Sequence, residues 1–166
     1  MKRTLALLLI ITVFAGAFVG CELANGLNIV KASKGLEFDL MEDGNYRVMG
    51  IGTCEDKDVV IPRFYKGKPV TRIESGAFMN CTWIESVVIP KSVTHISDLS
   101  FKGCTSLEKV YFANTSNWKV GIFEYDKYYD LYSFVLVPIE EDISDPSVAA
   151  KLLTSTYVNN VLKINE

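Results

Sequence analysis

The sequence has one histidine, few prolines and no surplus of basic side chains. His95 is the single imidazole among 166 residues, five residues are proline, and 17 Lys or Arg stand against 20 Asp or Glu, for a formal net charge of −3. Nucleic-acid-binding domains normally carry a basic stripe, so this balance argues against nucleic acid as a partner. A lone histidine leaves little material for acid–base catalysis, so we expect no enzymatic activity and no cofactor.

Residues 1–20 have the layout of a secretory signal peptide. Lys2 and Arg3 are followed by an almost unbroken apolar run over residues 4–18. This run of about 15 residues is shorter than the roughly 20 that a membrane-spanning helix needs. We therefore expect export from the cytoplasm. Without the segment, 15 basic and 20 acidic side chains remain, a net charge of −5.

The segment Val19-Gly20-Cys21 resembles a bacterial lipobox, in which the cysteine is acylated and becomes the mature amino terminus. The resemblance implies lipidation at Cys21, a tether over 21–35 and attachment to the membrane of a bacterial cell envelope. Two or more acyl chains would anchor the protein stably, because one chain binds a membrane only marginally. Two alternatives stay open: cleavage after Ala15-Gly16-Ala17 to give a secreted protein, and an uncleaved segment that is itself the anchor.

A repeat with a period of 23 residues occupies the middle of the chain. Val-Thr-Arg-Ile at 70–73 recurs as Val-Thr-His-Ile at 93–96. Ala-Phe-Met-Asn-Cys-Thr at 77–82 recurs as Ser-Phe-Lys-Gly-Cys-Thr at 100–105. Repeats of this length indicate a solenoid, in which each coil buries its apolar side only against its neighbours.

Each coil is predicted to contain a short strand that ends at a proline. Val-Val-Ile-Pro occurs at 59–62 and again, 28 residues later, at 87–90, so the first coil is about five residues longer. Alternate strand residues point to opposite faces, and proline has no N–H with which to continue the pairing. Parallel strands of successive coils would then stack about 4.8 Å apart. The strand residues expected to face the core are Val59, Ile61, Val87, Ile89, Val110 and Phe112.

These motifs resemble the BspA-like leucine-rich repeat family of bacterial surface proteins. The resemblance lies in the strand followed by Ile-Pro, the Val-Thr-x-Ile segment, Ala77-Phe78 and the Cys-Thr-x-Leu that begins at Cys104, and it covers roughly residues 36–119. It implies an α+β repeat fold, a short leucine-rich repeat solenoid with parallel strands. It also implies a module for adhesion or protein interaction at the cell surface, with no shared catalytic residues.

So short a solenoid needs caps at both ends. Asp43-Gly44 between apolar segments predicts a β-hairpin cap over residues 36–58, ahead of a solenoid over 59–120. The region 121–166 is predicted to contain a loop at 125–132, a strand at 133–138 and a helix that begins at Asp145-Pro146. Leu153, Tyr157 and Val161 are spaced for one buried helical stripe, and this tail either caps the last coil or packs beside it.

The side chains with reactive groups all have a structural interpretation. Cys81 and Cys104 occupy equivalent positions in adjacent coils, and we favour stacked buried thiols over a disulfide, with Cys54 left over in either case. No Cys-x-x-Cys spacing suggests a metal site. His95 is expected in an exposed loop, out of reach of those thiols, which disfavours a Cys-His hydrolase.

Two acidic groups in the carboxy-terminal region also have a structural interpretation. We expect a solvated loop and not a calcium site at Glu124, Asp126 and Asp130, because tyrosines interrupt any regular spacing of calcium ligands. The acidic residues from Glu140 to Asp145 read as linker charge and a helix cap.

The strand face that points away from the core is the candidate binding face. An exposed apolar ladder of this kind marks an interaction surface. The alternative is that β-branched residues simply suit strands and that the tail covers the face. The candidate binding face consists of the column Val60, Val88 and Tyr111, flanked by Asp58, Ser86 and Lys109.

The sequence therefore predicts a non-catalytic, lipid-anchored leucine-rich repeat module that binds a protein or glycan at a cell surface. A structural envelope lipoprotein without a specific ligand is the alternative function. The expected location is the bacterial cell envelope with the domain exposed at the surface, and secretion is the alternative location.

Overall fold

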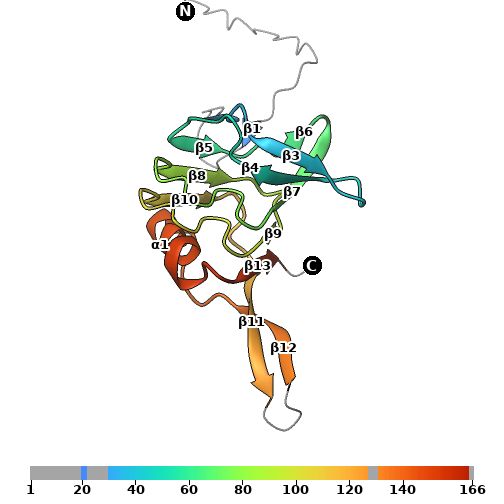
Figure 1. Cartoon of the computed structure of the whole chain (residues 1–166), viewed down its shortest axis with the longest axis vertical. Helices are drawn as coiled ribbons and strands as arrows, with labels where there is room; N and C mark the ends of the chain where they lie inside the picture. Colours follow the sequence, from blue (N-terminus) through green and yellow to red (C-terminus); the bar gives the residue numbers. More distant parts are fainter. Residues whose placement is uncertain (1–19, 22–29, 127–130, 165–166) are drawn as a thin grey trace, which may run out of the picture.

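The computed structural model describes residues 20–21, 30–126 and 131–164. Two sheets enclose the core, and a short helix closes one end of it (Figure 1). Among the described residues, no helix is long and apolar enough to cross a membrane. The strands are β1 Gly20–Cys21, β2 Val30–Lys31, β3 Glu37–Leu40, β4 Tyr46–Gly50, β5 Asp58–Val60, β6 Phe64–Tyr65, β7 Lys68–Ile73, β8 Ser86–Ile89, β9 His95–Ile96, β10 Lys109–Phe112, β11 Trp118–Asp126, β12 Leu131–Pro138 and β13 Val161–Ile164.

The smaller of the two sheets is made of equivalent segments from successive coils. Its order is β10, β8, β5, and all three strands are parallel. Asp58 pairs with Ser86, and Ser86 pairs with Lys109. Strand β8 ends immediately before Pro90, where the missing N–H stops the ladder. Residues 28 and then 23 positions apart therefore lie side by side, at the spacings of the sequence repeat.

The larger sheet has eight strands and mixed directions. Its path runs β12, β11, β13, β9, β7, β4, β3, with β6 paired to β7. Strands β4, β7 and β9 are parallel, whereas β3, β11, β12 and β13 add antiparallel pairs. His95 lies in β9, so its predicted place in an exposed loop is wrong. The Thr94 N–H donates to the Thr71 carbonyl and the Ser97 N–H to the Ile73 carbonyl, both at 2.9 Å, which extends the ladder on either side of His95.

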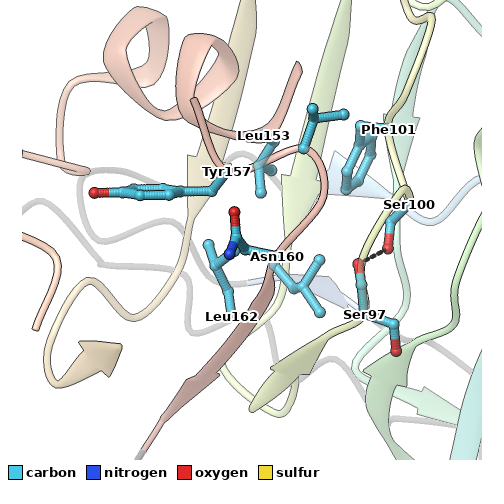
Figure 2. A pocket seen from close by; sticks show the side chains of 9 residues that line it. Ser97, Ser100, Phe101, Leu153, Tyr157, Asn160 and Leu162 are labelled. Atoms are coloured by element: carbon cyan, nitrogen blue, oxygen red, sulfur yellow. Dashed lines mark hydrogen bonds between the residues drawn. The ribbon is translucent and has the colours of Figure 1, made fainter. Parts of the chain in front are cut away.

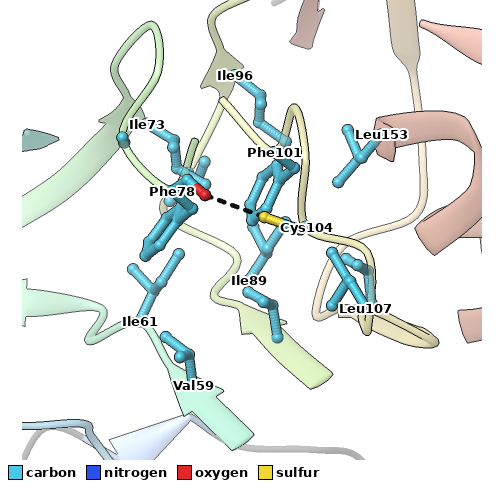
Figure 3. Close-up of a cluster of buried hydrophobic side chains, with 14 of the residues drawn as sticks. Val59, Ile61, Ile73, Phe78, Ile89, Ile96, Phe101, Cys104, Leu107 and Leu153 are labelled. Carbon is cyan, nitrogen blue, oxygen red and sulfur yellow. Dashed lines mark hydrogen bonds between the residues drawn. The ribbon is translucent and has the colours of Figure 1, made fainter. Parts of the chain in front are cut away.

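The core lies between the two sheets and the turns that join them. All six strand residues expected to face inward belong to the main apolar cluster, with Phe112 partly buried at its edge. Phe78 and Phe101 stack in successive coils, with ring centroids 5.1 Å apart and an angle of 13° between the rings (Figure 3). Both rings are almost completely buried, at 0% and 1% exposed. The same residue in each coil therefore fills the same place in the core.

The carboxy-terminal segment caps the last coil, but by a different route from the predicted one. Helix α1, Pro146–Lys151, begins where Asp145 accepts hydrogen bonds from the Ser147 and Val148 N–H groups, and it continues as a π-helical turn, Leu152–Thr156. The helix has ended before Tyr157 and Val161, so the proposed helical stripe is wrong beyond Leu153. Val161 instead opens β13, which pairs with β9 and β11.

The cap seals tightly against the last coil. Leu153 and Leu162 approach Phe101, and Asn160 and Tyr157 complete the contact (Figure 2). The space between these side chains does not admit a water molecule. Leu99 donates its N–H to the Val158 carbonyl at 2.6 Å, which fastens the cap to the coil. The sequence left open whether the tail caps the last coil or packs beside it, and in the structure the tail caps the last coil.

Two antiparallel hairpins flank the coils. β3 and β4 pair around the turn that contains Asp43 and Gly44, and β11 and β12 form a longer hairpin that projects from the molecule (Figure 1). Strand β11 runs to Asp126 and β12 resumes at Leu131, so strand occupies both ends of the predicted loop at 125–132. The middle of that loop, 127–130, lies outside the described residues. The predicted domain limits at 20, 35, 58 and 120 stay predictions.

Candidate functional site

The candidate binding face has the expected alternation but not the expected exposure. Val60 pairs with Val88, and Val88 pairs with Tyr111, so the three side chains form one column opposite the core. Val60 is only 5% exposed and Val88 only 7%. They form a second, small apolar cluster with the partly buried Tyr111 and Ala113. The prediction of an exposed apolar ladder is therefore wrong for the two valines.

The chain ahead of the first hairpin contacts this column at Val60. The Ser33 N–H donates to the Val60 carbonyl at 2.9 Å, and the Val60 N–H donates to Ser33 Oγ at 3.0 Å. This satisfies the edge of β5, which would otherwise present unpaired backbone groups. The alternative that the tail covers the face stays a prediction; the buried residues of α1, Ala149 and Ala150, belong to the main core cluster and not to the valine cluster.

What stays accessible on the candidate binding face is Tyr111 and a polar border. Asp58 and Lys109 are exposed, and Tyr111 and Ser86 are half-buried. Asp58 accepts a hydrogen bond of 2.5 Å from the Ser86 hydroxyl. A tyrosine beside buried valines, with a basic residue on its own strand and an acidic residue two strands away, offers contact area and hydrogen bonding, which suits binding and not bond cleavage.

A neighbouring ion pair adds to the polar border. The ammonium group of Lys57 lies 2.6 Å from a carboxylate oxygen of Glu85, and both side chains are exposed. The hydrogen bond to Glu85 raises the pKa of Lys57. Exposed pairs of this kind contribute little to stability, so this one matters chiefly as charge on the surface.

The cysteines are structural. Cys54, Cys81 and Cys104 are free and buried, which confirms the stacked thiols favoured from the sequence. The Cys104 Sγ donates to the Phe78 carbonyl at 3.0 Å (Figure 3). Burial raises the pKa of the Cys104 thiol to about 12 and also raises that of Cys81. Thiols that stay protonated are poor nucleophiles and poor metal ligands.

His95 is half-buried between two cationic side chains. Burial, and then the charges of Arg72 and Lys163, lower its pKa to about 4, although Glu74 opposes the shift. An imidazole with so low a pKa is a weak general base near neutral pH. Its position therefore lends no support to acid–base chemistry.

The remaining predicted sites that fall within the described residues give no ligand cluster. Cys21 pairs with Val30 between β1 and β2. The Asp145 carboxylate accepts from both the hydroxyl and the N–H of Ser147, which lowers its pKa and fits its role as helix cap. Asp130 lies outside the described residues. Within the part of the chain that the structure describes, no three His, Cys, Asp or Glu side chains gather in a way that would hold a metal ion.

A feature missed by the sequence analysis lies on the outward face of the larger sheet. Arg72, His95, Lys163 and Lys119 follow one another on adjacent strands, and we call these four residues the basic row. The equivalence of Arg72 and His95, 23 residues apart, was a usable signal for the first pair. No pattern in the sequence indicated that β13 and β11 would add the two lysines.

Comparison with known proteins identifies the family. The model described as "BspA type Leucine rich repeat region (6 copies)" matches residues 56–165, well over half of the chain. The chain belongs to this leucine-rich repeat family, which confirms the resemblance seen in its motifs. No curated protein matches the chain.

Solved leucine-rich repeat proteins are similar over part of the chain. One from T. pallidum is 29% identical, with 46% of this chain and 36% of that chain covered and a TM-score of 0.42. One from Bacteroides capillosus is 28% identical, with 50% and 64% covered and a TM-score of 0.44. A leucine-rich cell surface protein from Faecalibacterium prausnitzii is 26% identical, with 55% and 25% covered and a TM-score of 0.45. The chain spans less than two thirds of each of these proteins.

Proposed function

We propose that this protein is a non-catalytic, lipid-anchored module of a bacterial cell envelope that binds a protein partner at a cell surface. Membership of the BspA type leucine-rich repeat family supports a binding role. The observation that carries the proposal is Tyr111, which remains partly accessible beside the buried Val60 and Val88.

The location of Tyr111 gives it the properties of a binding anchor. Tyrosine offers a large contact area and has only two side-chain torsions to order, and it is enriched among the residues that dominate interface energies. Val88 lies beside it on the neighbouring strand and Val60 on the strand after that. The exposed Lys109 lies two residues before Tyr111 on the same strand, and the exposed Asp58 lies at the far edge of the same face. A protein partner with an apolar pocket and polar rim would complement this arrangement.

The family match and the chemistry of the candidate residues also support the absence of catalysis. The buried thiols have raised pKa values and His95 has a lowered one, so neither group is prepared for nucleophilic or base catalysis near neutral pH. Turnover that disappears in a His95→Ala variant would contradict this part of the proposal.

The binding proposal is tested by retention of envelope proteins on the immobilised chain. Tyr111→Ala is expected to weaken binding of a retained partner by at least about 2 kcal/mol, with a melting temperature close to that of the parent. Lys102→Ala, an exposed change in a turn of the coil, is the matched control and should bind normally. Saturable retention that Tyr111→Ala leaves intact would contradict the proposed face. No saturable retention at all would favour the structural lipoprotein.

A further inference from the structure

The basic row crosses the larger sheet on the side of the molecule opposite Tyr111. Lys119 pairs with Lys163, Lys163 with His95, and His95 with Arg72. Side chains of directly paired residues lie on the same face of a sheet. The adjacent row on these strands is fully buried, so the basic row points outward. That buried row consists of Val120, Leu162, Ile96 and Ile73.

Charge is balanced at one end of the basic row and not at the other. Arg47, the next position beyond Arg72, lies 2.8 Å from a carboxylate oxygen of Asp39 and 2.8 Å from one of Glu74. None of the ion pairs between described side chains involves Arg72, Lys163 or Lys119. A chain with a net charge of −3 therefore presents a local positive strip that ends at an acidic border. Such a strip attracts an anionic partner.

The spacing of the row suits an extended ligand. Neighbouring strands lie about 4.8 Å apart, so the Lys119 and Arg72 backbones are separated by roughly 14 Å across the sheet. Lys163 is exposed, and Arg72, His95 and Lys119 are half-buried, as on an open sheet surface. Several charges in a line favour a polymer that carries repeated anionic groups over a single small anion.

The pattern within the row favours a polysaccharide over a peptide. His95 is uncharged near neutral pH, so Arg72 and Lys163 are two cations about 9.6 Å apart with a hydrogen-bonding imidazole between them. An extended peptide would present side chains to one face about every 6.6–6.8 Å, which matches neither one strand spacing nor two. An acidic sugar that alternates with a neutral one supplies the observed order of charge and hydrogen bonding.

The neighbouring positions are compatible with a sugar ring. Val161 and Gly121 pair with each other on the same face of the sheet as the two lysines, two residues further along each strand. Gly121 is buried and Val161 is half-buried, so Val161 is the apolar side chain that borders the cations on this face. The apolar face of a sugar ring can rest against Val161 while its acidic group reaches the lysines.

We propose that the basic row binds an acidic polysaccharide, with Arg72, Lys163 and Lys119 pairing to its anionic groups and His95 hydrogen-bonding to an uncharged hydroxyl. Arg72 suits the role because its planar guanidinium pairs with carboxylate or sulfate through two parallel hydrogen bonds. The proposal goes beyond the proposed protein-binding function, because it uses the opposite face and requires neither Tyr111 nor the lipid.

The test is titration of the full-length chain at low ionic strength with hyaluronan, in which an acidic and a neutral sugar alternate, and with heparin. A variant that combines Arg72→Gln, Lys119→Gln and Lys163→Gln is expected to bind both polymers at least about tenfold more weakly. A matched variant with Lys91→Gln, Lys102→Gln and Lys151→Gln removes the same charge from exposed positions outside the row, and it should stay within about twofold of the parent. Circular dichroism and thermal melting check that both variants fold.

Five further results decide the proposal. Binding to the acidic polymers that weakens with added salt supports the proposal. So does a lack of binding to dextran, which is a neutral polymer. Equal losses in the two triple variants overturn it, because net charge alone would then account for the binding. Tighter binding of polyglutamate than of either polysaccharide also overturns it and makes an acidic peptide the occupant. The Tyr111→Ala variant should bind the polysaccharides normally, which separates this site from the protein-binding face.

Discussion

At the scale of single residues, the repeat fixes backbone conformation as well as packing. Gly76 and Leu99 are 23 residues apart and have positive φ angles of 68° and 58°, and Asn80 and Gly103 form a second such pair at 61° and 78°. Each turn therefore needs a left-handed residue at two positions. Glycine or asparagine meets this need at little cost, whereas Leu99 is a bulky exception whose N–H is held by Val158.

Substitution of Gly103 is expected to destabilise the fold more than substitution of another left-handed glycine. A Cβ at Gly103 would collide with Asn80 Oδ1, whereas a Cβ at Gly44 would meet nothing within 4 Å. Gly44→Ala should cost about 1 kcal/mol for the conformation alone, and Gly103→Ala should cost clearly more. Urea unfolding of the two variants measures the difference, and equal losses would show that the Asn80 side chain moves aside freely.

The protonation of His95 is expected to make stability depend on pH. Its folded pKa of about 4 lies below the ordinary value of 6.5, so the unfolded chain binds the proton more readily. The contribution of the neutral, buried imidazole to the free energy of unfolding is therefore fully present above about pH 6.5 and is lost as the pH falls toward about 4. Urea unfolding at pH 7 and pH 4.5 should show a smaller loss for His95→Gln than for the parent. If the parent and His95→Gln lose the same free energy of unfolding between pH 7 and pH 4.5, the burial of the imidazole does not make stability depend on pH.

At the scale of elements, the sequence predicted what the repeat encodes and little else. Strands β5, β8 and β10, the inward direction of Phe78 and Phe101, and the stacked thiols all follow from residues that recur 23 or 28 positions apart. The β9 strand was missed because two residues leave no alternation to detect. The β13 strand was missed because Val161 continues a helical spacing, and only the tertiary pairing with β9 and β11 overrides it.

The cap made by β13 is expected to depend on one side chain in particular. Leu162 is 2% exposed and belongs to the main core, whereas its neighbour Lys163 is exposed. Leu162→Ala should lower the free energy of unfolding by about 2–5 kcal/mol. Lys163→Ala, the control on the same strand, should change it by less than about 0.5 kcal/mol. Similar effects of the two changes would show that β13 adds little to the core.

At the scale of the whole molecule, the candidate binding face could be located from the sequence but its accessibility could not. Alternation identified the column of Val60, Val88 and Tyr111. The contact that occupies the edge of the column comes from Ser33, 27 residues before Val60, in a segment expected to be a tether. No repeat or periodic pattern links those two segments, so only the folded chain reveals the contact.

The proposed lipid anchor concerns the whole chain, and a single change tests it. Cys21→Ala is expected to abolish incorporation of labelled fatty acid and to move the protein toward the soluble fraction, because no acyl chains would hold it at the membrane. Glu22→Gln, beside the cysteine, should leave the labelling unchanged. Unchanged labelling of Cys21→Ala would rule out that cysteine as the acylated residue. Protease treatment of whole cells then shows whether the domain faces outward.

The antiparallel pairing of β13 with β9 has a consequence for the size of such molecules. A parallel array offers its last strand as a template for another identical coil, but here the chain turns back and occupies that position itself. The helix and Leu162 fill the exposed end of the core at the same time. A longer relative built on this plan cannot grow at its carboxy-terminal end without discarding the cap. New coils can therefore be added only ahead of the cap, either between existing coils or on the amino-terminal side of the array.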